Sequence, residues 1–257
     1  MDLQRVFPQN EVCLCKDERR SRTWRINNIN EPPINHVSRW LQTELLSPAI
    51  NWIEIAANTS PLYEEVIAQR LGLIPINADP LRMELYAQGE SSPTQSSCTE
   101  RSCIVFDLVV ENNTQQVMNV TSDQLRWVPF NNQLQIFADR YPKPFYPDLL
   151  ILRLYPGQKI AIRAYAVLGT GIQHAKWSAT NPYFGPCSII DSLRPTCIKC
   201  PQLSLTTRYQ PGFNCYYFTI ELKGGLSYQD VQNQLETRFT WNGLYPPQRV
   251  RYFFENQ

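Results

Sequence analysis

The cysteines are the residues of this sequence whose spacing is best suited to a chemical role. Cys197 and Cys200 are separated by two residues, and thiolates at this spacing can hold one metal ion from a single tight turn. Cys187 and Cys215 could complete a four-thiolate site. These cysteines indicate a zinc or an iron–sulfur site, and zinc is favoured because the spacing is not that of ferredoxins. The alternative is that they are buried cysteines that pack as small apolar residues.

The sequence predicts that its eight cysteines are thiols rather than disulfides. Residues 1–5 contain no apolar signal region, and disulfides are rare in proteins that are not secreted. A further pair, Cys98 and Cys103, has half of the ligands that a zinc site needs. We therefore expect an intracellular protein whose one possible cofactor is zinc.

Catalysis is not indicated by the remaining polar residues. The chain has two histidines: His36, which lies on an expected helix, and His174, which follows a Gly-Thr-Gly turn. A catalytic nucleophile needs a positioned base, and two isolated histidines offer few ways to build one. Nucleotide-binding loops, zinc-protease motifs and hydrolase motifs are absent from the sequence.

The charge balance limits the partners of the chain. It has 24 basic and 23 acidic side chains among 257 residues, whereas non-specific binding to nucleic acid requires many cationic contacts. Charged residues make up 18%, below the roughly 25% that is typical of soluble domains. Either the surface is rich in uncharged polar residues or much of it is covered by partners. No apolar run is long enough for a membrane-spanning helix.

Apolar periodicity predicts the elements that must position these residues. A three- and four-residue spacing predicts helices, and alternation predicts strands. The expected helices cover residues 34–45, 62–71 and 227–239. The expected strands cover residues 21–29, 49–57, 104–110 and 215–222, and residues 150–154 and 160–164 are expected to form a hairpin across a Pro-Gly turn. Residues 182–214 are expected to be irregular.

This order of elements predicts the fold class. Strands and helices at both ends enclose a β-rich middle, which is typical of an α+β chain. The same order indicates one domain that is interrupted by another.

Several segments resemble the α-like assembly subunits of multisubunit RNA polymerases. They are Ala49–Ser60, Glu65–Pro75, Leu154–Gln158 and the Gly-x-Gly-x-x-His-Ala-Lys-Trp loop at Gly169–Trp177. Their order and spacing agree with the family from Trp24 to Trp177. The likeness is greatest to the third-largest subunit of eukaryotic RNA polymerase II. The α-like subunit shared by polymerases I and III, the archaeal α-like subunit and the bacterial α subunit are more distant relatives.

The resemblance implies two domains and no catalysis. A discontinuous dimerisation domain would comprise residues 1–57 and 213–257, and a mainly β insert domain would comprise residues 58–212, with the cysteine segment 187–200. The implied partners are a smaller α-like subunit, the second-largest subunit, for which the pair is an assembly platform, and small zinc-containing subunits. DNA would be met only through the complex, in the nucleus, or in the host cytoplasm or virion if the chain is viral.

The resemblance also implies the residues that bind partners. Asn35 and Arg39 match the first-helix motif that faces the large subunit, in which Ser38 replaces an arginine. The other implied residues are Glu65, Arg70, Gly169, Gly171, His174, Lys176, Trp177, Val231, Leu235 and Phe239. The alternative function is a stand-alone zinc or iron–sulfur protein that uses Cys187, Cys197, Cys200 and Cys215.

Overall fold

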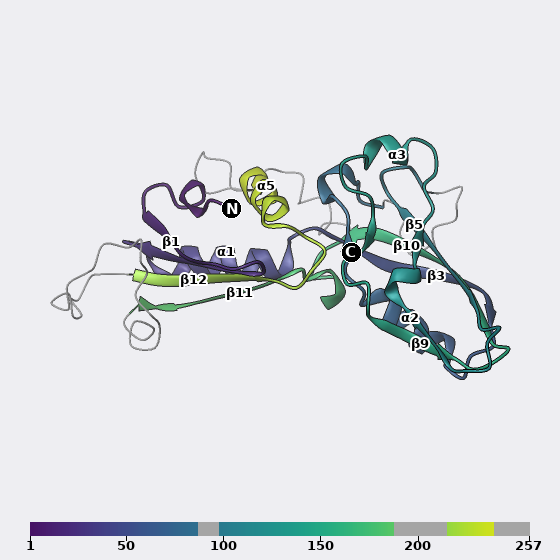
Figure 1. Ribbon diagram of the computed structural model, residues 1–257. Coiled ribbons are helices and arrows are strands. Elements are labelled where there is room, and N and C mark those ends of the chain that lie inside the picture. Colours follow the sequence, from purple (N-terminus) through teal and green to yellow (C-terminus); the bar gives the residue numbers. More distant parts are fainter. Residues whose placement is uncertain (87–97, 188–214, 239–257) are drawn as a thin grey trace. The chain divides into compact units, whose positions relative to one another are not determined.

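The structure, a computed structural model, describes residues 1–86, 98–187 and 215–238 (Figure 1). These residues divide into two compact units. Unit 1 comprises residues 1–39, 182–187, 215–221 and 227–238. Unit 2 comprises residues 40–86, 98–181 and 222–226. Unit 1 is thus assembled from segments that are distant in the sequence, whereas unit 2 is nearly continuous.

Unit 1 is built on a four-stranded sheet in the order β1-β2-β12-β11. Its strands are β1 (Glu11–Asp17), β2 (Ser21–Asn27), β12 (Cys215–Leu222) and β11 (Thr180–Pro186). β2 and β12 are antiparallel, with Trp24 opposite Phe218 and Ile26 opposite Tyr216. The buried Trp24, Ile26 and Phe218 therefore lie on one face of the sheet.

Helical segments complete unit 1. These are η1 (Leu3–Arg5), α1 (Glu31–Thr43), which continues into unit 2, and α5 (Tyr228–Arg238). Ile34, Val37 and Leu41 of α1 are buried, as their helical spacing predicted. The ring of Tyr228 on α5 lies edge-on to that of Trp24, at 6.5 Å between centroids. This contact packs α5 on the sheet.

Unit 2 contains a second four-stranded sheet and two small ones. The large sheet has the order β3 (Ser47–Asn58), β10 (Lys159–Gly169), β5 (Ile104–Glu111) and β7 (Arg126–Trp127). The small sheets pair β4 (Ile76–Asn77) with β8 (Lys143–Pro144) and β6 (Met118–Thr121) with β9 (Leu150–Leu154). The helices are α2 (Glu64–Gly72), α3 (Gln133–Ile136), η2 (Pro80–Arg82), η3 (Ser122–Gln124) and η4 (Ala175–Trp177).

One apolar core joins these elements of unit 2. The inward side chains of the large sheet, among them Ile50, Phe106 and Ile162, pack with Ile67 of α2 and Leu152 of β9. All of these side chains are almost fully buried. Their burial supplies the main driving force for folding this unit.

The opposite face of the large sheet carries a row of charges of alternating sign. Glu54, Arg163, Asp107 and Arg126 are direct cross-strand neighbours on β3, β10, β5 and β7. The Arg163 guanidinium donates two hydrogen bonds to the Asp107 carboxylate, at 2.8 and 2.9 Å. Opposite charges in adjacent positions favour this register over a shifted one.

The predicted α+β class is confirmed, but the predicted hairpin is wrong. The Pro-Gly turn forms, with Gly157 at φ 74° and a hydrogen bond of 3.0 Å from Gln158 N to Tyr155 O. However, β9 pairs with β6, whereas β10 pairs with β3 and β5. The turn is therefore a corner between two sheets, because the apolar side chains of β9 and β10 enter the core from different sheets.

The prediction that residues 182–214 are irregular is also wrong at its start, since β11 extends to Pro186. This strand lies at the sheet edge, where proline is tolerated because its missing N–H faces away from the ladder. The compact units divide the chain within α1, β11 and β12 rather than at the expected boundaries 57/58 and 212/213. The dimerisation and insert domains themselves stay a prediction.

Candidate functional site

The loop between β10 and η4 has a shape that requires its two glycines. A Cβ atom at Gly169 would lie 2.4 Å from Cε2 of Trp177. The Trp177 indole is buried, and its Nε1 donates a hydrogen bond of 3.2 Å to Val167 O. Gly169 is therefore required by the packing of the indole and offers no side chain to a partner.

The second glycine of the loop is equally constrained. A Cβ atom at Gly171 would lie 2.0 Å from the carbonyl oxygen of Gln42. Next to it, the backbone N–H of Ile172 donates to Thr43 O at 3.0 Å. The hydroxyl of Ser47 donates to Trp177 O at 2.6 Å. These contacts fix the loop against the end of α1 and the start of β3.

His174 and Lys176 differ in what they contribute. The His174 ring caps η4, because its Nδ1 accepts a hydrogen bond of 3.0 Å from Lys176 N. Lys176 places its ammonium 4.3 Å from the centroid of the Trp177 ring and donates a hydrogen bond to Asn51 Oδ1. Burial lowers the pKa of Lys176. Lys176 thus brings a cationic side chain to this loop, and its ammonium is partly removed from water.

On α1, the predicted residues Asn35 and Arg39 are exposed and lie one helical turn apart. They lie opposite the buried stripe of Ile34 and Val37, so a partner can reach both. Ser38, which lies between Asn35 and Arg39 in the sequence, is buried.

On α2, Glu65 is exposed in the first turn, where a carboxylate is favoured by the helix dipole. Arg70, in the last turn, donates a hydrogen bond of 2.7 Å from Nη1 to Ile151 O on β9. Arg70 therefore ties α2 to the unit 2 core. Glu65 and Arg70 thus lie in opposite end turns of α2.

The last helix does not present the predicted apolar residues. Val231 and Leu235 are fully buried within the chain, and Phe239 lies outside the described residues. Both buried side chains stabilise unit 1 itself, because they are enclosed by the chain's own atoms. A partner that contacts α5 would have to use other residues of the helix.

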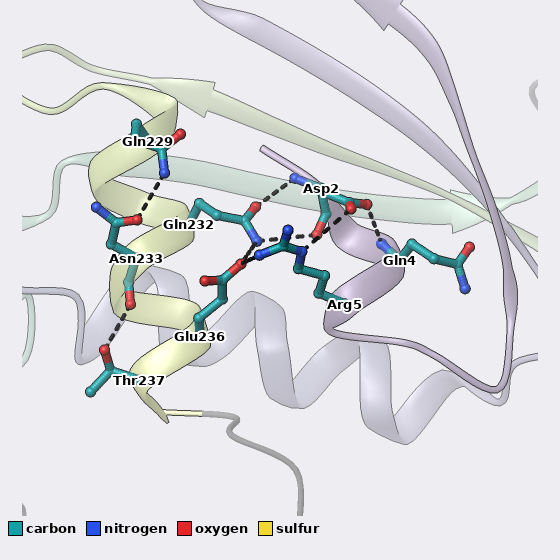
Figure 2. A network of polar contacts seen from close by, with 8 residues as sticks. All are labelled: Asp2, Gln4, Arg5, Gln229, Gln232, Asn233, Glu236 and Thr237. Carbon is teal, nitrogen blue, oxygen red and sulfur yellow. Dashed lines mark hydrogen bonds and ion pairs between the residues drawn. The ribbon is translucent and has the colours of Figure 1, made fainter.

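Hydrogen bonds and an ion pair connect α5 to the amino-terminal segment, as Figure 2 shows. Gln232 Oε1 accepts a hydrogen bond from Asp2 N, and Arg5 Nη1 lies 2.8 Å from Glu236 Oε1. The Gln232 amide and the Arg5 guanidinium lower the pKa of Glu236. Sequence reasoning missed Asp2 and Arg5, because no periodic signal links residues 230 positions apart.

The prediction that all cysteines are thiols is wrong for one pair. Cys187 and Cys215 form a disulfide that joins the ends of β11 and β12, so the expectation of thiols is wrong for this pair. Neither sulfur is a thiolate in this state, and the pair does not fit a zinc site. Cys197 and Cys200 lie outside the described residues. Burial raises the pKa values of Cys98 and Cys103, which remain thiols.

Within the described residues, no group of three or more histidine, cysteine, aspartate or glutamate side chains is arranged to hold a metal ion. In the same part of the chain, no helix is both long and apolar enough to cross a membrane.

Comparison with known proteins identifies the family. The RNA polymerase Rpb3/RpoA insert domain matches residues 53–193, more than half of the chain. The chain belongs to the Rpb3/RpoA family of RNA polymerase subunits. The match covers the loop at Gly169–Trp177 but neither α5 nor the exposed residues of α1.

Curated members of the Rpb3/RpoA family are similar over different lengths. Subunit RPAC1 of DNA-directed RNA polymerases I and III from Mus musculus is 35% identical over 160 residues, which are 58% of this chain and 46% of that protein. RPAC1 from Saccharomyces cerevisiae is 30% identical over 66% of this chain and 55% of that protein. The chain thus spans about half the length of these two relatives.

An archaeal member is similar over more of the fold. Subunit Rpo3 of the DNA-directed RNA polymerase from Pyrobaculum arsenaticum is 35% identical over 211 residues, which are 79% of this chain and 75% of that protein. The family resemblance stated from the sequence motifs is confirmed by this similarity and by the insert-domain match.

Proposed function

We propose that this chain is a non-catalytic assembly subunit of a DNA-directed RNA polymerase. It pairs with a smaller α-like subunit through the dimerisation domain, and the pair is the platform on which the second-largest subunit docks. The observation that carries this proposal is the similarity to Rpo3 across 79% of the chain. Because the 211 similar residues are more than unit 2 contains, they include segments of both compact units. The small zinc-containing polymerase subunits are further partners, and DNA is reached through the complex.

The surface of α1 supports the docking part of the proposal. Asn35 and Arg39 are exposed on the same side of the helix, and a guanidinium can bind a partner carboxylate through two parallel hydrogen bonds. The nucleus is the proposed location, since RPAC1 proteins belong to polymerases I and III of eukaryotes.

The proposal is tested by co-expressing the chain with the smaller α-like subunit and the second-largest subunit from the same genome. We expect a soluble heterodimer that then captures the second-largest subunit. Recovery of the chain as a stable monomer with affinity for neither subunit would exclude the proposal.

Arg39→Ala refines this test. It is expected to weaken capture of the second-largest subunit roughly tenfold, because one charge-assisted contact is lost. The heterodimer is expected to stay intact. Arg19→Ala, which removes another exposed arginine of unit 1, is the matched control. Equal capture by both variants would remove Arg39 from the interface.

A zinc ion bound by Cys187, Cys197, Cys200 and Cys215 stays a prediction. Because two of these cysteines form a disulfide, such a site requires that bond to be reduced. Elemental analysis of reduced protein, with Cys197→Ser as the comparison, is the measurement. Absence of both zinc and iron from the reduced protein would end the metal-binding alternative.

A further inference from the structure

Lys176 is a cation held partly out of water, and no carboxylate in the described part of the chain pairs with it. Among the ion pairs of residues 1–86, 98–187 and 215–238, none involves Lys176. Its contacts are the indole face of Trp177 and the amide oxygen of Asn51. An ammonium has three N–H donors, so these contacts leave donor capacity for water or for a partner.

Arg163, in the same compact unit, is a cation that has a counter-charge within the chain. Its guanidinium is matched by the Asp107 carboxylate, and this contact raises the pKa of Arg163. The pKa of Lys176 moves in the opposite direction, because burial is its one resolved cause. Partial burial of a charge is costly unless a counter-charge and hydrogen bonds compensate it. The interactions of Lys176 within the described chain are therefore incomplete.

The ammonium is nevertheless held in place. The Cδ atom of Lys176 lies 4.0 Å from the position that a Cβ atom would occupy at Gly72, so the side chain runs along the end of α2. The buried Trp177 next to it anchors the backbone. A cation that is fixed before binding loses less conformational entropy when a partner arrives.

Two exposed aliphatic side chains belong to the segments that Lys176 lies in or runs along. Leu73, which follows Gly72, is 56% exposed, and Ile172, in the same loop as Lys176, is 54% exposed. A fixed positive charge on segments that also expose aliphatic side chains is complementary to an acidic segment that carries apolar residues.

We propose that Lys176 binds an aspartate or glutamate side chain of another polymerase subunit, with Leu73 and Ile172 packing against aliphatic residues of the same segment. That the partner is a polymerase subunit follows from the proposed function, on which this inference rests. The Lys176 ammonium would then have the counter-charge that Arg163 already has, and Asn51 would orient it.

The first test uses the purified polymerase that contains the chain. A water-soluble carbodiimide activates carboxyl groups, and an amine in contact with one attacks it and forms an amide with release of the urea. We expect a coupled peptide that joins Lys176 to an acidic residue of a different subunit. We also expect acetylation of Lys176 to be slower in the polymerase than in the isolated chain, with exposed Lys143 as the internal control.

The second test measures competition during assembly. Wild-type and variant chains with different tags are co-expressed, and their ratio in the purified polymerase is determined by mass spectrometry. Lys176→Met is expected to lower the ratio about tenfold and Lys176→Glu further, because it adds repulsion. Lys143→Glu, with the same change of charge at an exposed site, is expected to leave the ratio near one. Thermal unfolding of each isolated variant shows whether it folds.

The outcomes separate this inference from the proposed function. If the chain enters no polymerase, the proposed function fails. If it enters the polymerase but Lys176 is acetylated as fast as in the isolated chain, or couples only to a residue of its own chain, the inference fails alone. The acetylation result uses the wild-type chain, so it decides the matter even if a variant does not fold.

Discussion

The two compact units differ in how the chain builds them. In unit 2, side chains from residues 40–86 and 98–181 form one apolar core. In unit 1, β2 pairs with β12, and the hydrogen bond between the hydroxyls of Thr23 and Thr219 spans 196 residues. Both units depend on pairing between distant segments, but the separation is longer in unit 1, whereas unit 2 has the extended apolar core.

The largest expected effect tests the core of unit 2. Phe106→Ala removes a fully buried ring and is expected to lower the free energy of unfolding by about 3–5 kcal/mol. Val109→Ala, on the same strand but 73% exposed, is expected to cost less than about 0.5 kcal/mol. Urea unfolding measures both values. Similar losses for the two variants would contradict the placement of the core.

A smaller effect is expected from the disulfide of unit 1. Replacing Cys187 and Cys215 together by serine is expected to cost roughly 2–4 kcal/mol, because the bond restricts a stretch of 28 residues in the unfolded chain. Peptide mapping without reduction should recover Cys187 linked to Cys215, with Cys98 and Cys103 as thiols. Cys13→Ser, which breaks no disulfide, is the control. Linkage of Cys187 to any other cysteine would contradict the pairing of β11 with β12.

The smallest effect concerns the paired hydroxyls. Thr23→Val alone is expected to cost about 1–2 kcal/mol, because it leaves the buried Thr219 hydroxyl without its partner. Adding Thr219→Val should recover most of this loss, since two methyl groups then face each other. Additive losses in the double variant, measured by urea unfolding, would show that the two residues do not meet.

The parts of the fold that were predicted from sequence are those with strong local periodicity. The stripe of Ile34, Val37 and Leu41 predicted α1, and the alternation at residues 104–110 predicted β5. β11 was missed because Pro182, Gly185 and Pro186 remove the local strand signal, while pairing at a sheet edge still tolerates them. The hairpin failed because a turn specifies a local reversal and not the sheet that each strand joins.

The candidate site was likewise predicted only in part from the sequence. The motif at Gly169–Trp177 was found through its resemblance to the family, but the reason for each glycine became evident only from Trp177 and the Gln42 carbonyl. The incomplete interactions of Lys176 could not be predicted, because burial and the absence of a nearby carboxylate among the described residues are properties of the fold. The disulfide was missed because the lack of an apolar signal region at residues 1–5 favoured thiols, and cysteine spacing alone does not specify a pairing.

The long separation between β2 and β12 has a consequence for biosynthesis. A ribosome adds roughly 5–20 residues per second, so Thr219 is made on the order of 10–40 seconds after Thr23, which lies 196 residues earlier. During that interval, the edge of β2 that later pairs with β12 has no native partner. The nascent chain thus exposes an unpaired strand edge while unit 2 is being synthesised, and such an edge is prone to aggregate. Protection of this edge during translation, by a chaperone or by an assembly partner, would therefore favour correct completion of unit 1.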